Sequence, residues 1–176
     1  ASHSCLATAA PKILSRVGQP VSFSVGGAAT GTTTGQALIT PLDLVSSGTT
    51  NTPRVQNIVR FLVMLDTDND PANGISISSA VRSTAANWTV NFDAADLATE
   101  LAPIIAAASA ADGTVHTLPA AATAQSHLEA TLLCVRSGAF RGTFTGTDNG
   151  PLAIMIDAVT GAGSGVAFSN DNNALV

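Results

Sequence analysis

Apolar residues between positions 55 and 65 recur at the spacing of one face of a helix. The intervals of three and four residues match the period of a helix that buries a single side. The apolar members of this series are Val55, Ile58, Val59, Leu62 and Leu65. Thr52 and Pro53 precede them, and proline is favoured at the first helical position. The pattern predicts a helix over 51–66 with Thr52 as its cap.

Three further helices are expected. Residues 92–110 are rich in Ala and Leu, with Asp93 as the expected cap. Pro103 lies inside this segment, and because proline lacks a backbone N–H we expect it to bend or divide the helix. Residues 121–138 carry apolar residues at helical spacing and end in glycine. A short helix is expected over 40–48.

Alternating apolar and polar residues predict strands near both ends of the chain. Residues 21–27 alternate clearly, whereas 28–36 indicate a flexible loop or a polar edge. Two other short candidates for strands are 36–40 and 87–92. The last third contains three strand-like runs separated by turn sequences, which predicts an antiparallel meander. These runs are 138–146, 150–161 and 164–170.

The order of these elements predicts the fold class. Strands come first, then a central segment of three to four helices, then a C-terminal antiparallel β-meander, which is an α+β order. A chain of 176 residues is long enough to bury one core. We therefore expect an N-terminal arm over 1–17 and a single α+β domain over 18–176.

Residues 65–76, LDTDNDPANGIS, carry the sharpest chemical signal in the chain. Asp66, Asp68 and Asp70 stand at alternate positions, and Asn73 follows them. Calcium takes six to eight oxygen ligands, which alternating aspartates in a short loop supply. The three carboxylates also follow the end of a helix, where negative charge is disfavoured. We therefore predict a Ca²⁺ site at these four residues.

Two alternatives to calcium stay open. Asp, Asn, Pro and Gly form turns without a metal, so the segment is also typical of a solvated turn. The second alternative is a loop whose charge is offset by Arg60 or Arg82. The segment is not an EF-hand, because Pro71 occupies the glycine position and Ile77 occupies the position of the last glutamate.

Composition limits the classes of partner. Charged residues make up 11% of the chain, and the net charge of −5 comes without any basic run, which argues against nucleic acid. No apolar run reaches about 18 residues, so no transmembrane segment is expected. We interpret Ala1 as a mature N-terminus left by a signal peptide, although an arbitrary boundary is the alternative. Export predicts one disulfide, Cys5 to Cys134, whereas a cytosolic protein would hold two free thiols.

No catalytic constellation is recognised. His127 and Cys134 fall on one face of the predicted helix over 121–138, where such a pair can serve as base and nucleophile. We interpret them instead as a surface histidine and a disulfide cysteine. The protein is therefore expected not to be an enzyme.

Three blocks of sequence carry a resemblance. They are GQPVSFSVGG…ITPLDLV, then NIVRFLVMLDTDNDPANGISIS, then HLEATLLC…SGAFRGTFTGTDNGPLAIMIDAVTGAGSGVAFS. In this order they resemble a group of bacterial exported proteins, many of them lipoproteins or adhesin-like surface proteins. The resemblance covers about residues 18–169 and implies a secreted or cell-surface location without enzymatic chemistry. No lipobox is present, and residues 1–15 match nothing in the group.

We expect an exported bacterial structural protein, a subunit of an extracellular matrix, adhesin or filament, stabilised by Ca²⁺ and a disulfide. Low charge and candidate edge strands suit self-association into a homo-oligomer or filament. The first alternative is a monomeric cell-surface module that binds a ligand. The second is a secreted hydrolase that uses Asp and Glu residues near the aspartate loop.

Overall fold

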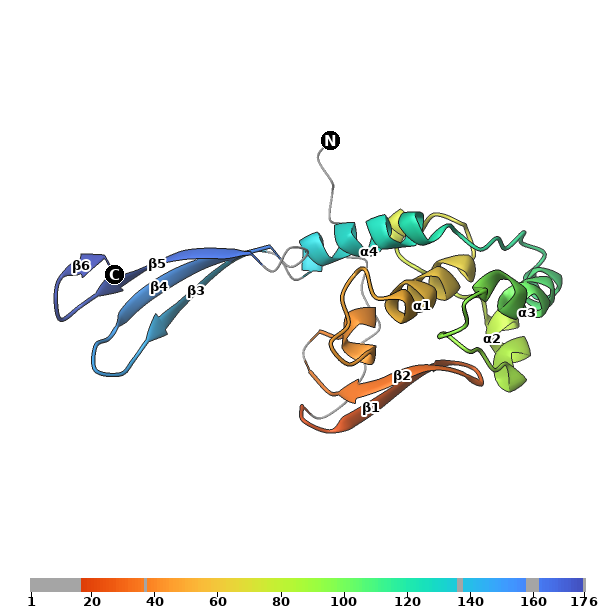
Figure 1. Ribbon diagram of the computed structural model, residues 1–176, viewed down its shortest axis with the longest axis horizontal. Helices are drawn as coiled ribbons and strands as arrows, with labels where there is room; N and C mark the ends of the chain where they lie inside the picture. The colour runs from red at the N-terminus through yellow and green to blue at the C-terminus, as the bar shows by residue number, and fades with distance from the viewer. Residues whose placement is uncertain (1–16, 37, 136–137, 158–161, 176) are drawn as a thin grey trace. The chain divides into compact units, whose positions relative to one another are not determined.

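The computed structural model describes residues 17–36, 38–135, 138–157 and 162–175. It is an α+β fold with an N-terminal strand pair, a helical middle and a C-terminal four-stranded meander, as the order of elements predicted (Figure 1). The predicted N-terminal arm, residues 1–17, lies outside the described residues except for Val17. Within the described residues, no helix combines the length and the apolar character needed to cross a membrane.

The contacts of the chain fall into two compact units, with the boundary between Leu128 and Glu129. The expectation of one domain over 18–176 stays a prediction, and each unit is described by itself. The first unit contains β1 (Pro20–Val25), β2 (Ala28–Thr34), α1 (Pro53–Met64), α2 (Ser79–Thr84) and α3 (Leu97–Asp112). Its short 3₁₀ turns are η1 (Pro41–Leu44), η2 (Pro71–Asn73) and η3 (Ala85–Asn87). The boundary falls inside α4 (Ala121–Val135).

The core of the first unit is built around α1. The buried side chains of this helix are Val55, Ile58, Val59, Phe61 and Met64. Val55, Ile58 and Val59 belong to the predicted stripe, whereas Leu62 is half-buried, and Phe61 and Met64 widen the buried arc beyond that stripe. The ring of Phe61 meets the ring of Phe92 edge-on, with centroids 5.4 Å apart. Residues from β1, α2 and α3 complete the cluster, so burial along one helix face organises the unit.

The hairpin β1–β2 is fixed to η3 by glycine. Gly26 has a φ of 58°, and a Cβ at this position would lie 2.3 Å from the carbonyl oxygen of Ala85. The neighbouring Gly27 amide donates to the same oxygen at 2.9 Å. Only a residue without a side chain permits this approach. The hairpin turn therefore contacts the helical layer through its backbone.

Several predicted boundaries are wrong. Of the two alternatives for 28–36, the loop is wrong over 28–34, which form β2, because threonine favours strands and Ser22 bonds Thr32 across the pair at 3.0 Å. The described residues of 36–40 and 87–92 form no strand. The predicted short helix over 40–48 is the turn η1, with the Asp43 carboxylate accepting from the Thr40 amide at 2.6 Å.

The N-terminus of α3 also differs from the prediction. Asp96, not Asp93, caps the helix and accepts from the Thr99 amide at 3.2 Å. Asp93 instead forms an ion pair with Arg54 of α1. Pro103 does not divide α3, which is assigned as one helix. Its missing N–H removes one helical hydrogen bond without ending the helix.

The second unit carries the predicted meander. Its strands are β3 (Gly138–Phe144), β4 (Gly150–Ile156), β5 (Gly163–Ser169) and β6 (Ala174–Leu175), paired antiparallel in that order. The register pairs Phe140 with Ile154 and Ile154 with Gly165. Polar contacts join two of the turns, since Asn170 Nδ2 donates to Asn149 Oδ1 at 2.9 Å.

Candidate functional site

The predicted calcium loop begins where α1 ends. The Leu65 amide bonds the carbonyl of Phe61 at 3.3 Å, and Asp66 follows directly. The chain then reverses with positive φ angles of 57° at Asn69 and 106° at Gly74. Because the C-terminal end of a helix carries partial negative charge, carboxylates here need donors or positive charge to offset them.

Hydrogen bonds within the loop engage three of the predicted ligands. Asp68 Oδ1 accepts from the Asp70 amide at 3.1 Å, and its Oδ2 accepts from Asn73 Nδ2 at 2.8 Å. Asp70 Oδ1 accepts from the Ala72 amide at 3.2 Å. The hydrogen bond from Asn73 is the largest cause that lowers the pKa of Asp68, and the Asp70 amide adds to it. Asp70 and Asn73 therefore shape the turn.

Asp66 has a different environment. Its side chain is fully buried, and Oδ1 accepts from the Ser76 amide at 2.8 Å, but Oδ2 accepts no hydrogen bond. Burial raises the pKa of Asp66, and the nearby charge of Asp68 raises it further, although the Ser76 amide opposes both. Arg60, a predicted alternative partner, donates instead to the Pro119 carbonyl at 2.8 Å. A buried carboxylate oxygen without a partner is costly, so Asp66 needs an explanation.

His127 of α4 lies within electrostatic reach of Asp66. Burial lowers the pKa of the His127 ring, whereas the charge of Asp66 acts in the opposite direction. The net lowering favours a neutral ring, which does not compensate a carboxylate. The sequence paired His127 with Cys134, whose side chain lies outside the described residues, so no catalytic pair is described.

The predicted calcium ligands do not converge as a set of four. Among the residues that the structure describes, no three His, Cys, Asp or Glu side chains are placed to hold one metal ion. The carboxyl groups of Asp66 and Asp68 interact with each other. Asp70 and Asn73 serve the turn, as described above. A cation here would therefore use two carboxylates, completed by other oxygen atoms.

A buried histidine, His116, is not among the residues that the sequence singled out. His116 Nδ1 lies 2.8 Å from the carbonyl oxygen of Met64, and Nε2 lies 3.2 Å from Asp112 Oδ1. Burial of Asp112 raises its pKa, but hydrogen bonds from Thr114, Ser78 and His116 outweigh this and lower it. The pair joins the end of α1 to the end of α3, which is a structural role.

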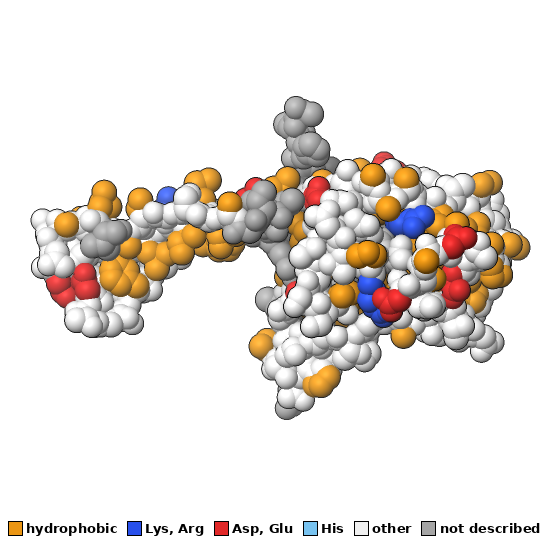
Figure 2. All heavy atoms as spheres, viewed as in Figure 1, with side chains coloured by type: hydrophobic (Ala, Val, Ile, Leu, Met, Phe, Trp, Pro, Cys, Tyr) orange, Lys and Arg blue, Asp and Glu red, His pale blue; other side chains and the backbone are white. Residues whose placement is uncertain are grey.

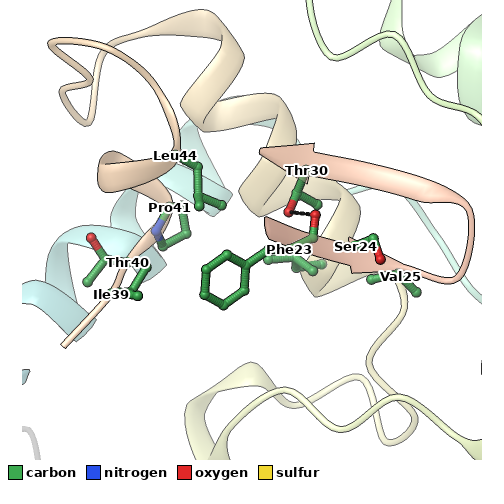
Figure 3. A pocket seen from close by; sticks show the side chains of 9 residues that line it. Phe23, Ser24, Val25, Thr30, Ile39, Thr40, Pro41 and Leu44 are labelled. Carbon is green, nitrogen blue, oxygen red and sulfur yellow. Dashed lines mark hydrogen bonds between the residues drawn. The ribbon is translucent and has the colours of Figure 1, made fainter. Parts of the chain in front are cut away.

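A small apolar pocket lies beside the first hairpin. Its volume is about 210 Å³, and Figure 3 shows Phe23 directed from β1 toward the segment 39–44. The lining residues are Phe23, Ser24, Val25, Thr30, Ile39, Thr40, Pro41, Leu44 and Leu62. The polar groups of this lining are engaged, since Thr30 Oγ1 donates to the Phe23 carbonyl at 3.1 Å and Thr40 bonds Asp43. The pocket therefore offers apolar contact.

The sheet of the second unit presents an uninterrupted apolar face. Side chains of directly paired residues lie on the same face of an antiparallel sheet. By the observed register, one face carries Phe140, Phe144, Leu152, Ile154, Ile156 and Ala167, with Gly138, Gly142, Gly150, Gly163 and Gly165 between them. We call this set the glycine-apolar face. Ser169, the last residue of β5, falls on the same face by alternation but is buried, so the exposed side chains of this face are apolar.

Three large residues of the glycine-apolar face are exposed, whereas Phe144 and Leu152 are half-buried. Phe140 is 49% exposed, Ile154 is 37% exposed and Ile156 is 40% exposed. Figure 2 shows apolar side chains along the strands of this unit. Apolar residues of the opposite face, Met155 and Val166, are also exposed. Antiparallel sheets ordinarily pack at least one face on a core. The exposed apolar side chains of this sheet therefore make it a candidate contact surface.

The predicted disulfide lies outside the described residues. Cys5 is not described and neither is the side chain of Cys134, so the disulfide stays a prediction. Comparison of the chain with family models, curated proteins and solved structures found no match. The resemblance to adhesin-like exported proteins therefore also stays a prediction.

Proposed function

We propose that the protein is an exported structural subunit that self-associates through the glycine-apolar face of its C-terminal sheet. The observation that carries this proposal is the exposure of Phe140, Ile154 and Ile156 on a face whose exposed side chains are apolar. Exposed apolar area of this kind marks a surface that another surface covers. Export and the Cys5–Cys134 disulfide enter the proposal from the sequence, whose low charge and many small residues suit such a protein.

The shape of the face supports a second copy as the partner. Leu152, Ile154 and Ile156 form a central ridge along β4, and glycines of β5 flank it at Gly163 and Gly165. A ridge beside a glycine row is complementary to the same surface turned around. Sheets packed face to face lie about 10 Å apart, and interdigitating side chains fill that space. The absence of charge on the face removes a source of repulsion between two copies.

The edge of the sheet offers a further contact. Strand β3 is the first strand of the sheet, so its outer edge has no partner within the described residues. Unpaired backbone groups at an edge are a template for pairing with another chain. A face of three strands of seven residues measures only about 23 by 14 Å, which is small for a stable interface. We therefore propose that face and edge contribute together.

The test compares two lysine substitutions on adjacent residues of β4. Ile154→Lys places a charge on the glycine-apolar face, whereas Met155→Lys places it on the opposite face. We expect the unsubstituted chain to form concentration-dependent oligomers in sedimentation velocity and light scattering. Ile154→Lys is expected to be monomeric, because burying an unpaired ammonium is costly.

Met155→Lys is the matched control and is expected to keep the oligomer. Circular dichroism of both variants checks that the sheet persists. A chain that is monomeric without substitution contradicts the proposal. Oligomers that survive Ile154→Lys but disappear with Met155→Lys show that the opposite face makes the contact.

The small pocket favours a second candidate, a monomeric module that binds an apolar group. Its volume of about 210 Å³ falls below the usual range for ligand sites of roughly 300–1,000 Å³. It suits one apolar side chain of a partner better than a whole ligand. This candidate predicts a monomer at all concentrations, with binding lost when Leu44→Trp fills the pocket.

A further inference from the structure

Asp66 combines features that do not suit a plain turn. Its carboxyl is fully buried, and it follows directly on the negative end of α1. Oδ1 is satisfied by Ser76, whereas Oδ2 has no donor. A turn without a metal uses Asp68 and Asp70 as acceptors for its backbone amides. It does not require a buried carboxyl group at position 66. Something positive at Oδ2 would offset these costs.

The residues around Asp66 limit which positive group can contact its Oδ2 atom. Arg60 is engaged elsewhere, and no arginine donates to the loop within the part of the chain that the structure describes. The charge of Asp66 acts on the His127 ring, but burial of that ring favours its neutral form. Two partners remain, namely a proton on Asp66 shared with Asp68, or a metal cation between the two carboxyl groups.

We propose that Asp66 and Asp68 bind one Ca²⁺ ion, with Oδ2 of Asp66 as the buried ligand. Calcium accepts irregular oxygen shells, and its remaining ligands would be main-chain carbonyls and water. Asp70 and Asn73, which the sequence placed among the ligands, act by holding the loop. Two carboxylates make a weak site, so the expected dissociation constant is about 10⁻⁴–10⁻³ M, the range of extracellular calcium modules.

A buried Oδ2 without a donor agrees with a carboxylate that lacks a counter-charge. It also agrees with a protonated Asp66, so the test must separate the two. Asp66→Asn does so, because an amide preserves the acceptor for Ser76 and can donate to Asp68. Without calcium this variant should be at least as stable as the unsubstituted chain. With calcium it should lose the stabilisation that the ion gives.

The experiment uses the full chain, stripped with EDTA and confirmed metal-free. Calorimetric titration with Ca²⁺ is expected to show one site, with a rise of several degrees in melting temperature at saturation. Asp66→Asn and Asp68→Asn should each lower the affinity at least about tenfold, since calcium affinity follows the charge of its ligands. Asp68 is exposed, so its variant tests the site even if Asp66→Asn folds poorly.

Asp70→Asn is the matched control in the same loop and should keep the calcium response within about threefold, because asparagine replaces aspartate well as an N-cap. Asp171→Asn controls for the acidic turns of the C-terminal sheet. Absence of a calorimetric signal overturns the proposal and favours the shared proton. Unchanged affinity in both Asp66→Asn and Asp68→Asn places any bound calcium elsewhere and also overturns it. Neither outcome depends on the oligomeric state, so failure here leaves the proposed assembly standing.

Discussion

At the scale of single residues, buried polar groups decide how the first unit closes. Asp112 is held by the Thr114 amide, the Ser78 hydroxyl and the His116 ring, and its side chain is only 8% exposed. The His116 ring also contacts the Met64 carbonyl, so one network joins three segments. Such a network stabilises the fold only while Asp112 carries its charge.

The first prediction concerns acid. The lowered pKa of Asp112 means that the folded state binds its proton more weakly than the unfolded chain, whose value is near 3.8. Its contribution to stability is therefore present above that pH and is lost as the pH falls through the lower folded value. Asp112→Asn should reduce the free energy of unfolding at pH 7 by about 1–3 kcal/mol, with the difference shrinking below pH 4.

Urea unfolding at pH 7, 5, 3 and 2 measures this difference. Asp93→Asn, which removes an exposed carboxylate from the same unit, is the control. A difference for Asp112→Asn that stays constant with pH contradicts the assignment.

The burial of His116 shows what single residues cannot reveal in sequence. Its neighbours Thr114 and Val115 are those of an ordinary turn, and its decisive partner, Met64, lies 52 positions away. The aspartate loop is the opposite case, because its own Asp, Asn, Pro and Gly residues predicted a turn. Which of its aspartates would be buried was decided by packing at the end of α1, so Asp66 could not be separated from Asp68 and Asp70.

At the scale of elements, sequence patterns predicted those helices whose formation depends on residues close in the chain. The period of α1 depends on near neighbours in the chain, and this helix was predicted from it. The start of α3 was not, because Asp93 and Asp96 are both suitable caps. The choice follows from the distant Arg54, which pairs with Asp93 and leaves Asp96 to cap.

The second prediction concerns Pro103, an exposed residue inside α3. It deprives the helix of one hydrogen bond, so Pro103→Ala should raise the free energy of unfolding by about 1–3 kcal/mol, even after the greater freedom of the unfolded chain is counted. Ala106→Gly in the same helix calibrates the measurement and should cost about 1 kcal/mol. Denaturant unfolding at neutral pH is the readout, and a loss of stability in Pro103→Ala would mean that the helix depends on the proline.

At the scale of the whole molecule, the two units differ in how they dispose of their apolar residues. Every member of the main hydrophobic cluster lies between Val25 and Ala108, so the first unit carries its own core. The second unit is a sheet with large apolar residues exposed on both faces. The first unit therefore has a core for independent stability, and the second exposes the surface that we propose for association.

The third prediction follows from this division. A fragment of residues 17–135 should unfold cooperatively and remain monomeric at concentrations where the full chain associates, because it keeps the core and lacks the glycine-apolar face. Denaturant unfolding followed by circular dichroism tests the first property, and sedimentation velocity tests the second. An oligomer of the fragment would place the association surface in the first unit.

The position of the sheet along the chain also orders events during synthesis. The ribosome releases residues of the first unit before it releases β3 to β6, and domains generally fold as units while the chain emerges. The core around α1 can thus fold before any part of the C-terminal sheet has been synthesised. On the proposed association, nascent chains on one messenger RNA would contact one another through their C-terminal sheets only after each first unit has folded. This order limits misassembly between partly synthesised chains.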